Sequence, residues 1–259
     1  MDRMEKTFQR LKAEGRKALV GFLMGGDPTP EASEVACRTA LDNGVDILEL
    51  GVPFSDPTAD GPVIQAAGRR ALAAGMTLGK SLDLVRRLRK SHEAPIVLFG
   101  YVNPIFAHGY ERTAREAAEA GVDAMLVVDL PFEESGELRG YLARHGIAFI
   151  PLIAPTTPEA RMKVVLKGAQ GFVYYIMVKG VTGARAALAT GVEEHLALLR
   201  KNTALPLVAG FGVSSGDQAR AAAEHADGVV VGSALVAAAA EGRLAAFVKE
   251  LTAALPRRC

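Results

Sequence analysis

Short apolar segments alternate with amphipathic helical segments along almost the whole chain. Most apolar segments are continuous runs, such as residues 17–24 and 95–101, rather than alternations of apolar and polar positions. Continuous runs indicate strands buried on both faces, which is typical of parallel sheets covered by helices. The segments between them place apolar residues at helical spacing, as residues 77–90 do with Leu78, Leu82 and Val85.

This pattern predicts strands at residues 17–24, 45–50, 95–101, 123–128, 147–153, 171–177, 205–209 and 228–231. It predicts helices at residues 1–16, 31–43, 66–74, 77–90, 112–120, 133–145, 158–166, 192–201, 215–225 and 244–255. About eight strand–helix units in about 250 residues are typical of a (β/α)8 TIM barrel. We therefore predict one TIM-barrel domain over residues 1–259, with an extra N-terminal helix and inserted helices.

A doubly wound open sheet is the main alternative to the barrel. Such sheets usually have fewer strands and a glycine-rich fingerprint after the first strand, and residues 21–26 do not carry that fingerprint. The interval between residues 50 and 95 is long and holds two expected helices, so it is a candidate functional insertion.

The segment 49–62 opens this insertion and holds a group of carboxylates. It contains three prolines and two glycines, and also Glu49, Asp56 and Asp60. Carboxylates at the end of a buried strand and on the loop after it are a common arrangement for acid–base chemistry. The aspartates would also serve as helix caps, but Glu49 stands at the strand end among apolar neighbours. A buried carboxylate is costly without a purpose, so we interpret Glu49 as functional.

In a barrel the carboxyl ends of all strands meet at one face, and here they are mostly apolar and aromatic. The residues at these ends are Phe22, Glu49, Tyr101, Asp129, Ile153, Tyr175, Gly210 with Gly212, and Gly232 with Ser233. This set suits a flat apolar substrate with one reacting end. Packing of the barrel alone would also explain Phe22, Tyr101 and Tyr175.

Glycines follow the last two expected strands. Residues 210–214 follow the seventh strand, and Gly232 and Ser233 follow the eighth, just before a short helical stretch. Backbone N–H groups at such turns approach an anion closely, and barrel phosphate sites are frequently built from these two loops. Gly183, after the sixth strand, is a further candidate. The sequence thus favours a phosphate site, with simple tight turns as the alternative.

Composition excludes several other classes of function. Lysine and arginine total 30 against 29 aspartates and glutamates, so no basic excess indicates nucleic acid or an anionic membrane. Two distant cysteines, Cys37 and Cys259, form no disulfide framework, which favours the cytoplasm. No apolar run reaches the roughly 20 residues of a membrane span, and no signal peptide is recognisable. The five histidines fall in expected helices or near helix ends and not at strand ends, so we expect no metal site.

The acidic segment Glu49-Leu50-Gly51-Val52-Pro53-Phe54-Ser55-Asp56-Pro57, with residues 59–62 after it, closely resembles the signature of tryptophan synthase alpha chains. The resemblance continues through residues 26–28, 180–183, 210–214 and 232–233, and so covers nearly the whole chain. It implies retro-aldol cleavage of indole-3-glycerol phosphate to indole and glyceraldehyde 3-phosphate.

The same resemblance implies a role for each candidate residue. Glu49 would be the general acid–base, and Asp60 would bind the indole N–H and stabilise the positive charge that develops there. The implied indole pocket comprises Phe22, Tyr101 and Tyr175, and the implied phosphate ligands are Gly183, Gly212, Gly232 and Ser233. Thr182 would help the loop after the sixth strand close onto Asp60.

The resemblance also implies a partner, a tryptophan synthase beta chain that receives indole within an α2β2 heterotetramer. Pro53, Asp56 and the segment around Asn103 and Pro104 would lie at the contact. Pyridoxal phosphate would belong to the beta chain, so no cofactor is expected in this chain.

Residues 177–179, Met-Val-Lys, depart from the family pattern, in which many members carry Ser followed by Arg or Val. Two other functions remain open at this point. One is an aldolase or isomerase acting on a sugar phosphate, with Lys179 as a Schiff-base candidate. The other is a subunit that binds a phosphorylated ligand and only regulates its partner.

Overall fold

The computed structural model describes residues 2–176, 185–210 and 212–255, and for residues 185–192 the backbone alone. Its strands are β1 Ala18–Met24, β2 Ile47–Gly51, β3 Ile96–Gly100, β4 Ala124–Val127, β5 Ala148–Phe149, β6 Leu152–Ile153, β7 Val173–Ile176, β8 Leu207–Gly210 and β9 Gly228–Val231. All of them pair in parallel, in the order β5-β4-β3-β2-β1-β9-β8-β7-β6.

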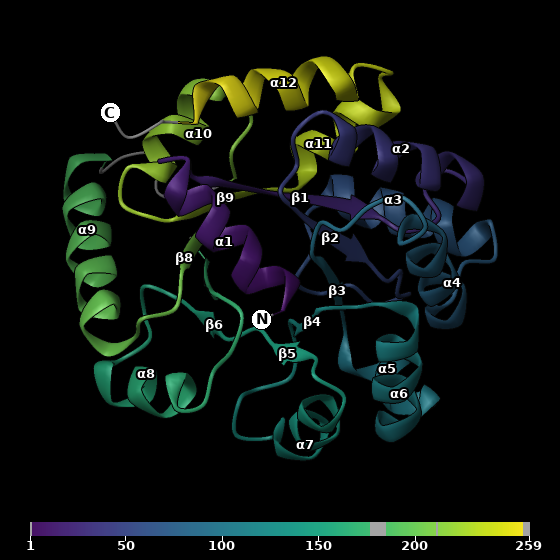
Figure 1. The fold of residues 1–259 in the computed structure, drawn as a ribbon, viewed down its shortest axis with the longest axis horizontal. Coiled ribbons are helices and arrows are strands. Elements are labelled where there is room, and N and C mark those ends of the chain that lie inside the picture. Colours follow the sequence, from purple (N-terminus) through teal and green to yellow (C-terminus); the bar gives the residue numbers. More distant parts are fainter. Residues whose placement is uncertain (1, 177–184, 211, 256–259) are drawn as a thin grey trace.

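The helices follow the strands in chain order. They are α1 Arg3–Ala13, α2 Pro30–Asp42, α3 Pro62–Ala73, α4 Leu78–Leu88, α5 Val102–His108, α6 Tyr110–Ala120, α7 Gly136–Arg144, α8 Glu159–Leu166, α9 Arg185–Asn202, α10 Gly216–Ala223, α11 Ser233–Ala240 and α12 Leu244–Ala254. Figure 1 shows the helices after α1 arranged around the outside of the curled sheet. Within the described residues, no helix is long and apolar enough to cross a membrane.

β5 and β6 are two halves of the fifth predicted strand. β5 pairs with β4, whereas β6 pairs with β7. Between them, the Ile150 N–H donates to the Met125 carbonyl at 2.9 Å, and the Pro151 carbonyl accepts from the Tyr174 N–H at 3.0 Å. Proline has no N–H to donate, which explains why the ladder is interrupted here. This segment therefore joins the two ends of the sheet, as the predicted TIM barrel requires.

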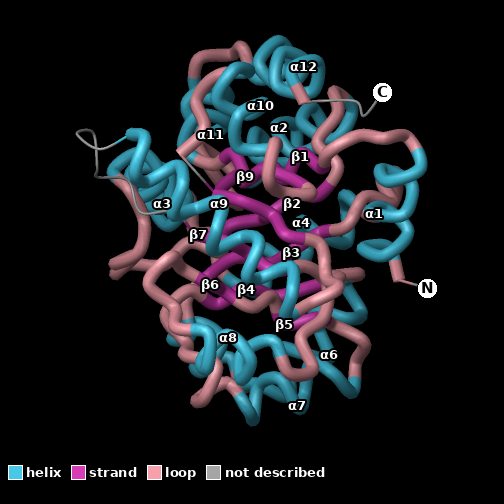
Figure 2. Tube along the Cα trace, turned by 90° about the vertical axis from the view of Figure 1, so that its left-hand side faces the viewer, coloured by secondary structure: helices cyan, strands magenta, loops and turns pink. Residues whose placement is uncertain are grey.

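Helix α1 covers one end of the barrel. Its Met4 packs into the barrel interior, and Phe8 approaches Phe172 with 6.2 Å between ring centroids. Two buried carboxylates at the start of strands hold it there: Asp46 pairs with Arg10 at 3.2 Å, and Asp123 pairs with Arg3 at 3.3 Å. Figure 2 shows α1 on the side opposite α3. The carboxyl ends of the strands are thus left open for chemistry.

The structure places Asn103 and Pro104 in helix α5, which lies in the interval between the strand predicted at residues 95–101 and the helix predicted at residues 112–120. Proline is tolerated in a first helical turn, where its missing N–H would have no partner within the helix. Helix α9 begins seven residues earlier than predicted, at residue 185 rather than 192. The short helical stretch predicted after Gly232 is present as α11.

Candidate active site

The side chain of Glu49 lies in the barrel interior, near the carboxyl end of β2. It stands in register with Phe22 on β1 and Val97 on β3. It is 0% exposed, and neither carboxyl oxygen has a hydrogen-bond partner among the residues that the structure describes. Buried polar atoms are usually paired, so an unpaired carboxyl group facing the barrel interior is a functional signal.

Burial raises the pKa of Glu49 to about 8. The carboxyl group is therefore mostly protonated near neutral pH, since the charged form is poorly solvated in the interior. A group with a pKa near the working pH gives and takes protons efficiently. Glu49 thus has the properties of a general acid that becomes a general base once its proton is transferred.

Asp60 is the second carboxylate of the site and lies on the loop between β2 and α3. Burial raises its pKa to about 6, and a hydrogen bond with the Tyr101 side chain opposes this rise. The Tyr101 hydroxyl also accepts from the Ala59 N–H at 3.0 Å. Tyr101 therefore fixes the acidic loop, and Asp60 remains largely ionised at pH 7 while Glu49 is protonated.

Aromatic rings form the walls around the carboxylates. Phe22 meets Phe99 edge-on at 5.1 Å between centroids, and Tyr101 lies 5.3 Å from Phe54. Both Phe22 and Tyr101 are buried, at 2% and 3% exposure. The structure thus brings Phe22, Tyr101, Glu49 and Asp60 to the same end of the barrel.

Tyr175 does not share this location, which corrects its assignment to the substrate pocket. Its side chain packs outside the barrel with Met162, Val165 and Leu199, and its ring lies 5.5 Å from that of His195. Tyr174 instead packs against the barrel interior, and burial together with the charge of Glu49 raises its pKa well above the ordinary value. Successive strand residues point to opposite faces, so the two tyrosines cannot exchange roles.

Glycines follow β8 and β9 at the same end of the barrel as Glu49. Gly212 has a φ of +64°, a conformation that side-chain-bearing residues rarely adopt. A Cβ on Gly232 would lie 3.7 Å from the Cβ of Phe22, so the β9 loop borders the aromatic wall. Ser233 is exposed at the start of α11, where helical N–H groups favour an anion. Thr182, Gly183 and Lys179 lie outside the described residues.

The outer rim of this end of the barrel carries an exposed aromatic side chain. Phe106 on α5 is 68% exposed and packs edge-on against Tyr110 at 5.7 Å between ring centroids. Asn103 and Asp56 are also exposed, whereas Pro53 is buried. A large exposed aromatic ring is unusual on a monomer surface and is enriched at protein interfaces.

Comparisons with known proteins agree with this geometry. Residues 8–254 match the family model described as "Tryptophan synthase alpha chain". A relative of that description from Geobacter sulfurreducens is 50% identical, covering 98% of this chain and 99% of its own. Another from Desulfosudis oleivorans is also 50% identical, covering 90% and 88%.

Solved structures give the same result for the fold. The tryptophan synthase subunit alpha of Legionella pneumophila superposes with a TM-score of 0.90 at 37% identity, covering 98% of both chains. A chain of tryptophan synthase from M. tuberculosis, in an aminoacrylate-bound form, has a TM-score of 0.90 at 32% identity and covers 99% of this chain and 100% of its own.

Proposed function

The chain belongs to the tryptophan synthase alpha chain family, whose enzymes are lyases, and we propose that it cleaves indole-3-glycerol phosphate to indole and glyceraldehyde 3-phosphate. The observation that carries this proposal is the unpaired, fully buried Glu49 in the barrel interior, with aromatic walls and anion-binding loops at the same end of the barrel. Phosphate at the loops and indole at the aromatic walls would place the substrate across Glu49.

Glu49 acts first as an acid in the proposed mechanism. It donates its proton to the indole ring carbon that carries the side chain, which leaves a positive charge on the ring. The resulting carboxylate takes the proton of the neighbouring side-chain hydroxyl. The carbon–carbon bond then breaks, its electron pair restores the aromatic ring, and the hydroxyl carbon becomes the aldehyde. The raised pKa of Glu49 supports both proton transfers.

Asp60 stabilises the charge that develops on the indole nitrogen. Its carboxylate accepts from the ring N–H, an interaction that strengthens when the ring becomes positive. Tyr101 supports this role because its hydroxyl ties the Asp60 loop to the end of β3. Phe22, Tyr101 and, in place of Tyr175, Tyr174 would enclose the ring, while Gly183, Gly212, Gly232 and Ser233 would bind phosphate. Thr182 would contribute to loop closure over Asp60.

The two carboxyl groups predict a bell-shaped dependence of kcat/KM on pH. Below about pH 6 Asp60 becomes protonated and loses the charge that it needs, and above about pH 8 Glu49 loses the proton that it must donate. We expect kcat/KM to fall on both sides of this window, measured as indole release between pH 5 and 10. Asp60→Asn should remove the acid limb, and a flat profile in wild type would contradict the assignment.

A beta chain is the proposed partner, in an α2β2 assembly in the cytoplasm. Pyridoxal phosphate would be bound by that chain and not by this one. The exposed Asp56, Asn103 and Phe106 lie on a surface whose composition supports such a contact, with Pro104 on the same helix. The buried Pro53 would shape the loop that carries Asp56 rather than contribute exposed area.

Phe106→Ser should weaken binding of the beta chain by about 10-fold or more. An exposed aromatic side chain that becomes buried when an interface forms contributes heavily to affinity. Titration calorimetry with the beta chain measures the dissociation constant. Val35→Ser, at a residue that is 64% exposed on α2, is the matched control and should leave affinity unchanged. Equal affinities for the wild type and Phe106→Ser would place the interface elsewhere.

The experiment that tests the proposed reaction is detection of both products. Wild-type protein with a beta chain should release indole and glyceraldehyde 3-phosphate in equal amounts from indole-3-glycerol phosphate. No turnover with a competent beta chain would redirect attention to a sugar-phosphate substrate and to Lys179, which borohydride trapping would then examine.

A further inference from the structure

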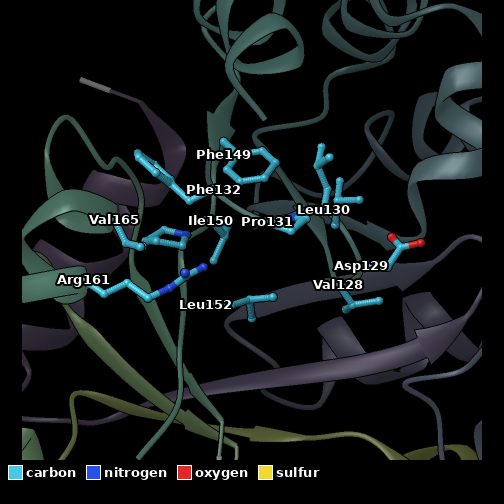
Figure 3. A pocket seen from close by; sticks show the side chains of 12 residues that line it. Val128, Asp129, Leu130, Pro131, Phe132, Phe149, Ile150, Leu152, Arg161 and Val165 are labelled. Carbon is cyan, nitrogen blue, oxygen red and sulfur yellow. The ribbon is translucent and has the colours of Figure 1, made fainter. Parts of the chain in front are cut away.

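A cavity of about 280 Å³ lies beside the carboxyl end of β4, where the fifth strand is split into β5 and β6. It is shown in Figure 3. The lining residues are Val127, Val128, Asp129, Leu130, Pro131, Phe132, Phe149, Ile150, Pro151, Leu152, Arg161 and Val165. We refer to this cavity as the side pocket.

The side pocket connects two layers of the fold. On one side, Val128 and Leu152 pack against the cluster that fills the barrel interior, as Tyr174 also does. On the other side, Val165 belongs to the outer cluster beneath α8 and α9. Figure 3 shows Arg161 and Val165 across the cavity from Val128 and Asp129. The broken pairing at Ile150 and Pro151 explains why space remains between the layers.

The walls of the side pocket are mostly apolar. The two charged residues in the lining both have partners: Asp129 accepts from the Val102 N–H at 2.8 Å, and Arg161 pairs with Glu133 at 3.0 Å. An apolar cavity of about 150 Å³ already accommodates benzene. The side pocket is therefore suited to a small uncharged group and not to an anion or a metal ion.

Strand order sets the position of the side pocket relative to the substrate. The loops after β8 and β9, which we propose for the phosphate, lie across the barrel from β3 and β4. A substrate anchored there by its phosphate extends its indole ring toward the far wall. The benzene half of the indole, which is farthest from the phosphate, is then directed toward Val128 and Leu152, which pack against the interior cluster and also line the side pocket.

We propose that the side pocket accepts substituents on the benzene ring of the substrate, so that the chain cleaves ring-substituted indole-3-glycerol phosphates. This inference rests on the proposed function. Val165 lies on α8, and its buried side chain, 3% exposed, forms the wall of the side pocket on the α8 side. Val165 therefore sets the depth of the side pocket. It is thus a specificity-determining residue that the unsubstituted substrate does not reach.

The test compares indole-3-glycerol phosphate with its 5-methyl, 6-methyl and 7-methyl analogues, using wild-type protein saturated with a beta chain. At least one analogue should keep kcat/KM within about threefold of the parent substrate. Val165→Phe fills the side pocket and should lower kcat/KM for that analogue by about 10-fold or more, the usual effect of one misplaced methyl group. For the parent substrate, Val165→Phe should change kcat/KM by less than about twofold.

Val164→Phe is the matched control, because Val164 is the neighbouring residue on α8 and is 51% exposed. Val164→Phe should leave kcat/KM unchanged for the parent substrate and for every analogue. Phe132→Trp fills the side pocket from the loop side and gives a second variant if Val165→Phe folds poorly. Rejection of every analogue by wild type, or an equal loss on parent and analogue in both variants, would overturn the inference. Failure to cleave the parent would instead refute the proposed function.

Discussion

Glu49→Gln is expected to lower kcat for indole release by about 10²- to 10⁴-fold, the usual contribution of a positioned general acid–base. Glutamine has nearly the same shape but cannot donate a proton to the ring carbon or accept one from the hydroxyl. The structure leaves both Glu49 oxygens without partners, so the exchange breaks no hydrogen bond of the fold. Single-turnover kinetics with a saturating beta chain measures the chemical step.

Substrate binding distinguishes a catalytic role from a structural one. Because the phosphate loops and aromatic walls are unchanged, the dissociation constant for indole-3-glycerol phosphate should remain within a few-fold of wild type. Glu34→Gln is the control variant, since Glu34 forms ion pairs with Arg38 and Arg87 on the helical surface. Full turnover by Glu49→Gln would remove Glu49 from the mechanism and would mean that another group transfers the protons.

Asp60→Asn is expected to lower kcat/KM by about 10²- to 10³-fold, comparable with the loss of one preorganised group that stabilises developing charge. The amide keeps the shape of the side chain but not the negative charge opposite the indole N–H. The loss should appear mainly in kcat, because the charge on the ring develops only in the transition state. Steady-state kinetics with a beta chain provides the measurement.

Two comparisons make the Asp60 result specific. Asp83→Asn removes an exposed carboxylate on α4 that pairs with Arg86. This variant should leave both kcat and kcat/KM unchanged. Tyr101→Phe removes the hydroxyl that holds the Asp60 loop and should reduce activity less than Asp60→Asn does. Activity of Asp60→Asn equal to wild type would mean that another group stabilises the ring.

The barrel was predictable because most of the buried strands are continuous apolar runs. The same property hid the orientation of β7: in the run Val173–Ile176 both faces are apolar, so Tyr174 and Tyr175 could not be assigned to the interior or to the outer layer. In the structure, Tyr174 pairs with Leu152 and Val208, and this register places its side chain against the barrel interior. The pleat is fixed by neighbouring strands, and a single sequence does not show their register.

Other differences arise from local features that the apolar pattern does not capture. Helix α5 was not predicted, although Pro104 fits the first turn of this helix. The side pocket depends on the split at Ile150 and Pro151, which the sequence shows only as a proline in an apolar run. Phe106 was missed as an exposed residue, because exposure depends on the helix that carries it.

Glu49, in contrast, could be proposed from its position, because a carboxylate is unusual at the end of an apolar strand, whereas the role proposed for Asp60 came from the family resemblance. A glutamate at the end of an apolar strand predicts burial, and the structure gives it 0% exposure. The structure also adds what the sequence could not, namely the hydroxyl of Tyr101 on Asp60 and the separation of the two pKa values, about 8 and about 6. That separation supports our proposal that Glu49 is the acid and that Asp60 is the charge-stabilising group.

The central claim is that Glu49 protonates the indole ring carbon and thereby releases indole. Cleavage of indole-3-glycerol phosphate in D₂O, followed by mass spectrometry of the indole, tests it most directly. We predict one deuterium at the ring carbon that carried the side chain, an equal amount of aldehyde, and near-complete loss of both products in Glu49→Gln. Labelled indole formed by Glu49→Gln at the wild-type rate would contradict the account.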